Sequence, residues 1–359
     1  MTISIQRPLR VVVLLPSEAI GATGGAAVQL DRLLRGWRGL GHHVELLAPK
    51  DTGSATVEKL LTQWRTTPPD IVHAEVPGAL ALALFKPLHA AGIPITSSFH
   101  HTFIHAPPGM APRALAFLLR FHLQCALTVA ESAGSLHLAS ALGLRELGLI
   151  RRGVDDALFA PSRRDPALRK TWGVGEQDPV LLWAGRLVPV KQPLDLVGVL
   201  AAVRQRCPRA KLVIAGEGPE LPRVRATLPS AIYTGALDQA TLARHYASAD
   251  LLVHTAPHEP AGNIHLEAAA SGLAVVGRSG DNLTELLVPA GAGRVANSAA
   301  ELAQQATRLA ADPALRRTMG EAGRNLVAVC GALAASEAWI AAWRRLLAAG
   351  RPAGTVETA

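Results

Sequence analysis

Residues 250–276, DLLVHTAPHEPAGNIHLEAAASGLAVV, contain the pattern from which the fold is predicted. The apolar run 250–254 predicts a buried strand, and 273–276 predicts a second one. Between them, 263–271 predicts a helix that begins at Asn263 as its N-cap and ends at the following glycine. Two short apolar strands joined by a helix are typical of a parallel α/β unit.

The same alternation of apolar runs and helical patterns extends through both halves of the chain. In the first half the predicted strands are 10–15, 44–48, 70–73, 94–98, 126–130 and 146–150. In the second half they are 180–184, 211–215, 231–234, 250–254 and 273–276. The fold class is therefore α/β, with two doubly wound parallel sheets whose ligands bind beyond the carboxyl ends of the strands.

The alternation breaks at residues 151–165, RRGVDDALFAPSRRD, which are rich in charge, glycine and proline. This break predicts a linker between two domains, as a length of 359 residues also favours. The predicted parts are a Rossmann-like domain over 1–152, a linker over 153–165, a second Rossmann-like domain over 166–335, a C-terminal helix over 336–350 that returns towards the first domain, and a frayed tail over 351–359.

The composition of the chain indicates a cellular compartment more clearly than it indicates a binding partner. The net charge is +8, which either reflects an anionic partner or follows from an arginine-rich composition. Three widely spaced cysteines form neither a disulfide framework nor a metal cluster, so a cytoplasmic location is expected. No apolar run is long enough to suggest a signal peptide or a membrane span, and we expect a soluble or peripheral protein.

Two glutamates flank the predicted helix start in the opening stretch. Glu259 precedes the turn, and Glu267 lies within the first two turns of the helix. Free N–H groups at a helix start, here at Gly262 and Asn263, suit a phosphate. Carboxylates accept hydrogen bonds from hydroxyls. The combination suits a ligand with both phosphates and hydroxyls, such as a nucleotide sugar.

Two cations follow the first predicted strand of the second half. Arg186 and Lys191 lie just past the end of strand 180–184, where they suit a diphosphate, or are simply solvated charges. After strand 211–215, the turn Gly216-Glu217-Gly218 either lets a base or ribose approach the backbone or is simply a turn.

In the first half, the candidates are a glycine pair and a histidine. Gly24 and Gly25 form a phosphate-loop-like turn or only a tight turn, and the G-x-G-x-x-G spacing of a dinucleotide site is absent. His100 ends strand 94–98, where it either hydrogen-bonds a sugar hydroxyl or has a structural role. No spacing typical of a metal site or of a serine hydrolase occurs.

Taken together and in order, these segments resemble the family 4 glycosyltransferases, which have the GT-B fold. The segments that carry the resemblance are GGAAVQLDRLLRGWRGLGHHVELLAP (24–49), PPDIVHAEVPG (68–78), GIPITSSFHHTF (92–103), RRGVDDALFAP (151–161), AGRLVPVKQ (184–192), VIAGEGPE (213–220), YTGAL (233–237), YASADLLVH (246–254) and HEPAGNIHLEAAASGL (258–273). The pattern is closest to the branch with sulfolipid synthases and GDP-mannose-dependent α-mannosyltransferases.

The resemblance implies a role for most of the candidates. Arg186 and Lys191 match the diphosphate-binding pair, Glu259 matches the hexose-contacting glutamate of the E-x7-E motif, and Glu267 matches the ribose-binding one. Gly24 and Gly25 match the turn near the donor phosphate, and His100 matches a histidine near the sugar. These assignments make Arg186, Lys191, Glu259 and His100 the expected catalytic residues.

The implied reaction is retaining transfer of a hexose from a UDP- or GDP-linked donor to a lipid or saccharide acceptor. No metal or other cofactor is implied, and no nucleic acid. A front-face mechanism is commonly proposed for the family, in which the leaving phosphate takes the acceptor proton.

Several positions depart from the family pattern. Ala261 replaces the usual Phe, His101 follows the site histidine in place of Thr, Arg152 replaces the linker Asn, and Arg278 follows a strand where a small residue is expected. These departures keep open a non-catalytic nucleotide-sugar-binding protein, and a GT-B nucleotide-sugar epimerase is a further alternative. A dinucleotide oxidoreductase is disfavoured because its fingerprint is absent.

Two amphipathic segments carry arginines beside apolar residues. They are 26–38, with Arg32, Arg35 and Arg38, and 110–124, with Arg113 and Arg120. Each predicts either a weak contact with an anionic membrane at its inner face or a core-facing helix with a basic rim.

Overall fold

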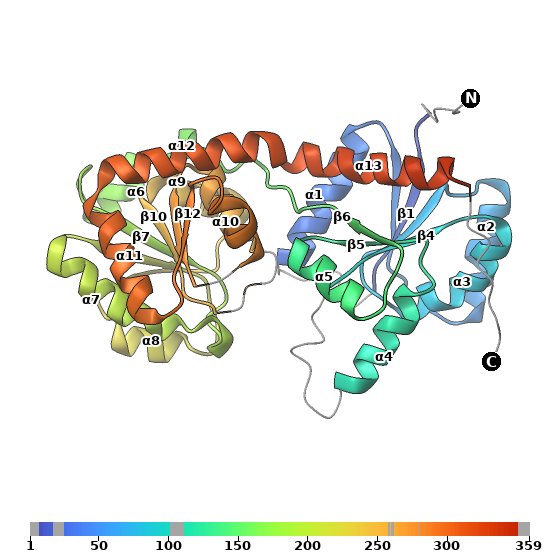
Figure 1. The fold of residues 1–359 in the computed structure, drawn as a ribbon, viewed down its shortest axis with the longest axis horizontal. Helices are drawn as coiled ribbons and strands as arrows, with labels where there is room; N and C mark the ends of the chain where they lie inside the picture. The colour runs from blue at the N-terminus through green and yellow to red at the C-terminus, as the bar shows by residue number, and fades with distance from the viewer. Residues whose placement is uncertain are drawn as a thin grey trace. The chain divides into compact units, whose positions relative to one another are not determined.

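The computed structural model describes residues 7–16, 25–100, 111–257, 259, 262–278 and 280–350 (Figure 1). The chain forms two compact units. The N-terminal unit comprises Met1–Arg152 together with Ala332–Ala359, and the C-terminal unit comprises Gly153–Gly331. The chain thus crosses between the units twice, once after Arg152 and once after Gly331.

The N-terminal unit contains a six-stranded parallel sheet in the order β2-β1-β3-β4-β5-β6. Its strands are β1 (Arg10–Leu14), β2 (His43–Leu47), β3 (Ile71–Ala74), β4 (Ile95–Ser98), β5 (Leu127–Ala130) and β6 (Leu147–Leu149). Its helices are α1 (Gly25–Gly39), α2 (Ser54–Thr66), α3 (Ala79–Ala91), α4 (Ala111–His122), α5 (Ala133–Ala141) and α13 (Ala332–Ala348).

The C-terminal unit contains a second six-stranded parallel sheet, ordered β12-β11-β10-β7-β8-β9. Its strands are β7 (Val180–Ala184), β8 (Lys211–Ala215), β9 (Ile232–Gly235), β10 (Leu251–His254), β11 (Ala274–Gly277) and β12 (Gly293–Val295). Its α-helices are α6 (Pro166–Thr171), α7 (Leu196–Arg206), α8 (Leu221–Thr227), α9 (Gln239–Ser248), α10 (Asn263–Ala270), α11 (Ala299–Ala311) and α12 (Pro313–Cys330). Shorter turns of helix are η3 (Pro161–Arg163), η4 (Pro189–Lys191), η5 (Pro193–Asp195) and η6 (Leu283–Leu287).

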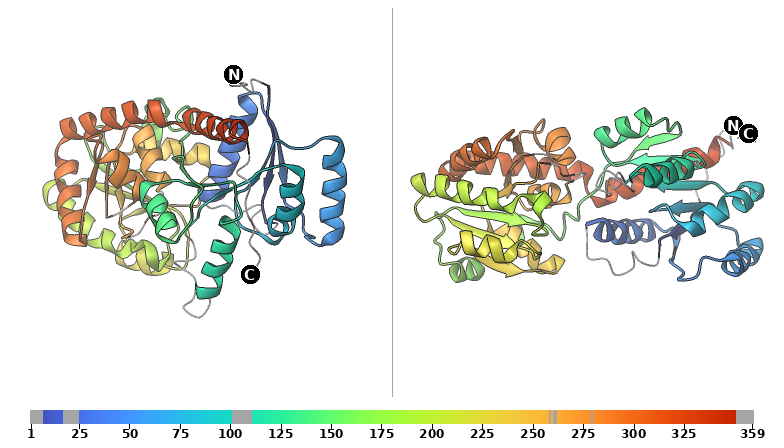
Figure 2. Two further views of the ribbon diagram at one scale, coloured as in Figure 1. Left: turned by 45° about the vertical axis from the view of Figure 1, so that its right-hand side comes forward. Right: turned by 90° about the horizontal axis from the view of Figure 1, so that it is seen from below.

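Each sheet has helices on both faces, as the views in Figure 2 show. Successive side chains of a strand point to opposite faces, so each central strand contributes to two cores. In β7, Val180 and Leu182 lie in one core, and Leu181 and Trp183 lie in the other. The predicted fold class, two doubly wound parallel sheets, is confirmed.

The helix at the opening stretch begins one residue earlier than predicted. Gly262, in the left-handed conformation (φ 69°), is the N-cap of α10, and Asn263 is the first helical residue. Glycine reaches this conformation without the steric cost that a side chain would add. At the other end, Gly272 (φ 78°) follows the C-cap, as predicted.

Helix α13 completes the core of the N-terminal unit. Trp339 and Trp343 on α13 pack against Trp37 of α1, with ring centroids 5.9 and 4.8 Å away. The helices approach closely because Gly36 has no side chain. A Cβ there would lie 2.0 Å from the hydroxyl of Ser336.

The expectation that no segment is apolar enough to span a membrane was wrong on composition. Pro313–Ala348, which includes α12 and α13, is long and apolar enough to do so, although 44% of its most apolar window is buried inside the protein. Met319 of α12 and Trp343 of α13 are both buried in cores. The hydrophobicity of this segment is therefore accounted for in large part by packing.

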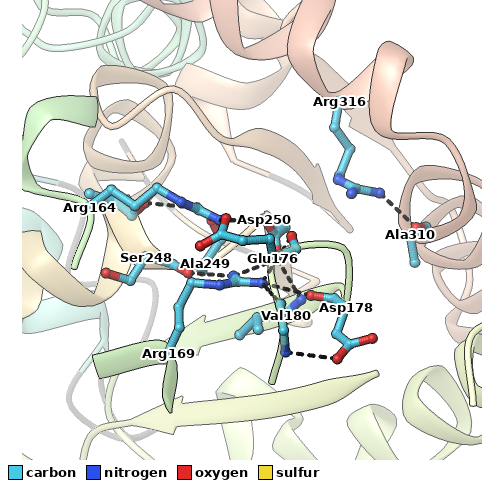
Figure 3. Close-up of polar contacts among 12 residues, drawn as sticks. Arg164, Arg169, Glu176, Asp178, Val180, Ser248, Ala249, Asp250, Ala310 and Arg316 are labelled. Atoms are coloured by element: carbon cyan, nitrogen blue, oxygen red, sulfur yellow. Dashed lines mark hydrogen bonds and ion pairs between the residues drawn. The ribbon is translucent and has the colours of Figure 1, made fainter. Parts of the chain in front are cut away.

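A buried arginine joins α6 to the strand starts of the C-terminal sheet (Figure 3). The Arg169 guanidinium donates to the carbonyl oxygens of Ser248 (2.8 Å) and Asp178 (2.9 Å) and to the Asp250 carboxylate (3.0 Å). The same carboxylate accepts from the backbone N–H of Val180 at 2.8 Å. Because these contacts lie where β7 and β10 begin, they are at the sheet edge opposite to the predicted ligand site.

Candidate functional site

Two glycine turns pack on each other beyond β7 and β8. Leu187 N–H donates to the carbonyl oxygen of Glu217 at 2.8 Å. A Cβ on Gly216 would lie 1.9 Å from the Gly185 carbonyl oxygen, and one on Gly218 would lie 2.3 Å from that of Leu187. Both glycines also have positive φ, 146° and 153°. Their presence thus has a packing reason, and the predicted donor contact of Gly216, Glu217 and Gly218 stays a prediction.

Lys191 and Glu259, 68 positions apart in the sequence, form an ion pair. Lys191 ends η4 beyond β7, and Glu259 follows β10. Glu259 Oε2 also lies 3.1 Å from His254 Nε2. Burial alone would raise the pKa of Glu259, but the hydrogen bond and charge of His254 and the charge of Lys191 lower it to about 2. Glu259 is therefore a carboxylate at neutral pH.

A second histidine lies behind the first. His265 Nε2 of α10 is 3.2 Å from His254 Nδ1, with the two rings edge to face. Burial, followed by the charge of His254, lowers the pKa of His265 well below its ordinary value. His254 is a site residue that was not predicted, although its place at the end of β10 was a usable signal.

Two further contacts hold the turn that carries Lys191. Thr255 donates to the Lys191 carbonyl oxygen at 2.6 Å and accepts from the indole N–H of Trp183 at 2.9 Å. Arg278, one of the departures from the family pattern, donates to the side-chain oxygen of Gln192 at 2.6 Å. Gln192 has a left-handed backbone (φ 44°), a costly conformation for a residue with a side chain. Arg278 therefore stabilises a strained turn next to Lys191.

The remaining predicted residues of the C-terminal unit differ in their surroundings. Glu267 is buried in α10 beside Tyr246. Burial, followed by the negative charge of Glu267, raises the pKa of the Tyr246 hydroxyl well above its ordinary value. Arg186 is exposed, and no ion pair joins it to another residue within the described part of the chain. Gly262 is buried and Asn263 half-buried at the start of α10.

In the N-terminal unit, His100 follows β4 and contacts a buried carboxylate. His100 Nε2 lies 3.1 Å from Oε1 of Glu75, which follows β3. Glu75 was not predicted as a site residue, although β3 and β4 are neighbours and their carboxyl ends lie at the same edge of the sheet. Gly25 begins α1. Gly24, His101, His258 and Ala261 lie outside the described residues, as does the tail 351–359.

No group of three or more metal-ligating side chains gathers anywhere in the described ranges. That the reaction needs no metal stays a prediction.

Two family models together match most of the chain. The model "Glycosyltransferase Family 4" matches residues 53–158, and "Glycosyl transferases group 1" matches residues 165–326. The two matches fall in the N-terminal and C-terminal units, respectively.

Among characterised relatives, a GDP-mannose-dependent alpha-mannosyltransferase of Mycobacterium tuberculosis is 31% identical over 294 residues, which are 77% of this chain and 74% of the relative. The sulfoquinovosyl transferase SQD2 of Arabidopsis thaliana is 30% identical over 64% of this chain, and the match covers 46% of the plant protein.

Solved structures share the architecture at low sequence identity. Anabaena HepE in complex with UDP and glucose superposes with a TM-score of 0.72 at 19% identity, over 93% of this chain and 98% of that one. Sucrose-phosphate synthase from Thermosynechococcus elongatus gives 0.77 at 19% identity, over 94% and 99%. Because the sequence identity is below 20%, these superpositions establish the GT-B fold and nothing about activity. On the sequence match to its relatives, the chain belongs to the group 1 glycosyltransferases of family 4.

Proposed function

We propose that this glycosyltransferase is a retaining hexosyltransferase that uses a UDP- or GDP-linked hexose and needs no metal ion. The observation that carries the proposal is the half-buried ion pair of Lys191 and Glu259 beyond the strand ends of the C-terminal sheet. HepE is described in complex with UDP and glucose, and the mycobacterial relative is described as GDP-mannose-dependent. Both descriptions support a nucleotide sugar as donor, and the relative favours GDP-mannose.

The paired charges suit the two ends of such a donor. Lys191 would exchange its partner Glu259 for the diphosphate, and Arg186 adds a second cation beyond the same strand. Glu259, released from Lys191 but still bonded to His254, would accept hydrogen bonds from the hexose hydroxyls. Glu267 is assigned to the ribose hydroxyls, and Gly262 and Asn263 to the phosphate at the helix start.

The reaction then needs little from the protein beyond charge and position. The bond from the anomeric carbon to phosphate breaks, and the bond to the acceptor oxygen forms on the same face of the sugar. The leaving phosphate takes the acceptor proton. Lys191 and Arg186 stabilise the negative charge that grows on this phosphate, which lowers the barrier without a metal ion.

A donor screen followed by a transfer assay tests the proposal. A thermal-shift series across UDP- and GDP-sugars identifies the donor, because a ligand that binds only the native state raises its stability. Lys191→Ala and Glu267→Ala are expected to abolish donor hydrolysis and transfer, and EDTA is expected to leave the wild-type rate unchanged. Arg209→Ala is the matched control, since this exposed cation pairs with Asp178 away from the site. Unchanged rates in Lys191→Ala would refute the assignment.

For the acceptor we propose a lipid or a saccharide, and for the location the cytoplasmic side of a membrane with weak peripheral contact through α4. Phe117 of this helix and Leu123, just after its end, are exposed, with 39% and 60% of each residue accessible, and the exposed arginines Arg113 and Arg120 lie near them in sequence. The other amphipathic segment, α1, is different because Leu33 and Trp37 are buried in the core. An epimerase would convert the sugar nucleotide without acceptor, so product analysis of that reaction separates the two activities.

A further inference from the structure

The buried carboxylate of Glu75 is the centre of a hydrogen-bonded cluster in the N-terminal unit. Only 3% of the residue is exposed. Its Oε2 atom accepts from the hydroxyl of Ser98 (2.9 Å) and lies 3.2 Å from His73 Nε2, while its Oε1 atom lies 3.1 Å from His100 Nε2. A buried carboxylate without partners is costly, and here three side chains supply hydrogen bonds.

A line of polar contacts lies behind Glu75. The Trp343 indole N–H donates to the Thr96 hydroxyl at 3.2 Å, and the Thr96 oxygen lies 3.0 Å from His73 Nδ1. His73 Nε2–H donates to the Glu75 carboxylate at 3.2 Å. This chain runs from α13 through β4 and β3 and fixes the carboxylate from the core side. Glu75 is therefore a rigid acceptor for His100.

With Nε2 of His100 committed to Glu75, the other ring nitrogen is the one left for a ligand. His100 Nδ1 lies 3.9 Å from Glu131 Oε2, which is too long for a hydrogen bond. The same Glu131 oxygen forms an ion pair with Arg152. The His100 side chain keeps 13% of its surface exposed.

The charges around the ring favour its protonated form. The Glu75 and Glu131 carboxylates flank the imidazole, and Arg152 offsets one of them. Burial alone would lower the pKa of His100, but the hydrogen bond to Glu75 and the charges of Glu131 and Glu75 raise it, against a smaller opposing effect of Arg152. With His100 protonated, two negative and two positive charges balance.

The other titratable neighbours do not compete for this charge. On β3, His73 directs its Nε2–H to Glu75 and away from the His100 ring. On α4, burial and then the charge of His100 lower the pKa of His122 to about 4. His122 is therefore neutral at physiological pH.

We propose that Glu75 is a positioning residue for His100, which it holds as an imidazolium with Nδ1–H directed to an oxygen of the substrate. This inference rests on the proposed function for the identity of that oxygen, a sugar hydroxyl or a phosphate. Arg152, which departs from the family's usual Asn, contributes to this arrangement. Its ion pair with Glu131 keeps that carboxylate from accepting a hydrogen bond from His100 Nδ1–H.

The test begins with a measurement that needs no turnover. In the full-length protein labelled with ¹⁵N-histidine, the imidazole signals are titrated by NMR, and His100→Gln assigns the signal of His100. The wild-type ring is expected to titrate above an ordinary histidine. Glu75→Gln, nearly the same shape without the charge, is expected to lower this pKa by about one pH unit or more. Exposed Glu45 on β2 provides the matched control, Glu45→Gln, which is expected to change nothing.

The second readout is the pH profile of transfer. Wild-type activity is expected to fall at high pH as His100 loses its proton, and Glu75→Gln is expected to move that limb to lower pH. At pH 8 the variant's kcat is expected to fall about 10²-fold, as for a misplaced acid or base. Ser98→Ala removes one hydrogen bond to Glu75 but keeps its charge, so it is expected to reduce kcat less and to leave the limb in place.

The outcomes separate this inference from the proposed function. A wild-type His100 that titrates at or below the ordinary histidine pKa would overturn the inference even if Glu75→Gln does not fold. So would a Glu75→Gln variant with an unchanged titration and pH limb. Failure to transfer any hexose would instead refute the proposed function, while the NMR titration still decides the role of Glu75.

Discussion

His254 Nε2 lies 3.1 Å from the Glu259 oxygen that also pairs with Lys191. One carboxylate oxygen therefore links the end of β10 to the turn that follows β7. Lys191 can leave this oxygen for a phosphate, but His254 is 2% exposed and stays in place. His254 is therefore the group that keeps Glu259 oriented while a donor is bound.

Replacing His254 should weaken donor use without removing any of the residues assigned to donor contacts. His254→Ala is expected to lower kcat/KM for the nucleotide sugar about 10- to 100-fold, which corresponds to a hydrogen bond to a charged group. His254→Gln, whose amide N–H can reach the same oxygen, is expected to recover part of the loss. Steady-state kinetics with varied donor measures both, and equal loss in the two variants would contradict this role.

The lowered pKa of Glu259 predicts how stability depends on acid. The folded-state pKa is about 2 against an ordinary 4.5, so the carboxylate stabilises the fold above pH 4.5 and this contribution is lost as pH falls towards 2. Urea unfolding of wild type and Glu259→Gln at pH 7, 4.5 and 3 is expected to give a difference in the free energy of unfolding that becomes smaller as the pH falls. A difference that does not change with pH would show that the charge of Glu259 is not its source.

Gly216 should tolerate no side chain, because a Cβ would lie 1.9 Å from a backbone oxygen at φ 146°. Gly216→Ala is expected to lower the free energy of unfolding by about 2 kcal/mol or more. Gly198 in α7, with nothing within 4 Å of a Cβ, is the control. Gly198→Ala is expected to stabilise by about 0.5–1 kcal/mol, and urea denaturation compares the two variants.

Arg169 should be required for the stability of the C-terminal unit. Arg169→Met removes the buried guanidinium that is hydrogen-bonded to Asp250 and leaves the carboxylate with the longer contact of Arg164 at 3.6 Å, so it is expected to cost about 3–5 kcal/mol of unfolding free energy. Arg209, which pairs with Asp178 but has 79% of its side chain exposed, is the matched control. Arg209→Ala is expected to lower the free energy of unfolding by about 1 kcal/mol or less. Similar losses in Arg169→Met and Arg209→Ala would show that the burial of Arg169 does not determine its contribution to stability.

The exposed face of α4 should govern binding to anionic vesicles. The double variant Phe117→Ser, Leu123→Ser is expected to lose co-sedimentation with vesicles that contain phosphatidylserine at low salt. Val329 and Leu333, 75% and 60% exposed, are apolar residues elsewhere that are at least as accessible, and their double serine variant is expected to bind like wild type. Equal binding of the wild type to neutral and anionic vesicles would refute the membrane contact.

Local patterns were sufficient for most of the fold. The predicted strands 180–184 and 211–215 coincide with β7 and β8 because each is an apolar run that ends at a glycine with positive φ. β12 was missed because Gly293–Val295 is three residues long and contains one large apolar side chain. A strand of that kind is specified by its neighbour β11 rather than by its own composition.

For the site, the sequence indicated residue types but not which residues meet. Lys191 and Glu259 were assigned to the two ends of a donor, whereas in the structure they pair with each other across 68 positions. Glu75 and His100 meet because β3 and β4 are adjacent, a fact of topology that no local spacing contains. Burial and partner geometry, which set the pKa values of both carboxylates, likewise depend on contacts between distant segments.

The packing of α13 has a consequence for the order in which the chain acquires structure. Residues up to 152 are synthesised first, but the contacts of Trp37 and Thr96 with α13 form only when Trp339 and Trp343 have been made. The C-terminal unit, contiguous from Gly153 to Gly331, needs no later segment. Although domains generally fold in the order of their synthesis, the unit that begins the chain here is the last to be completed. Until then, the apolar surface around Trp37 that α13 covers has no partner from that helix.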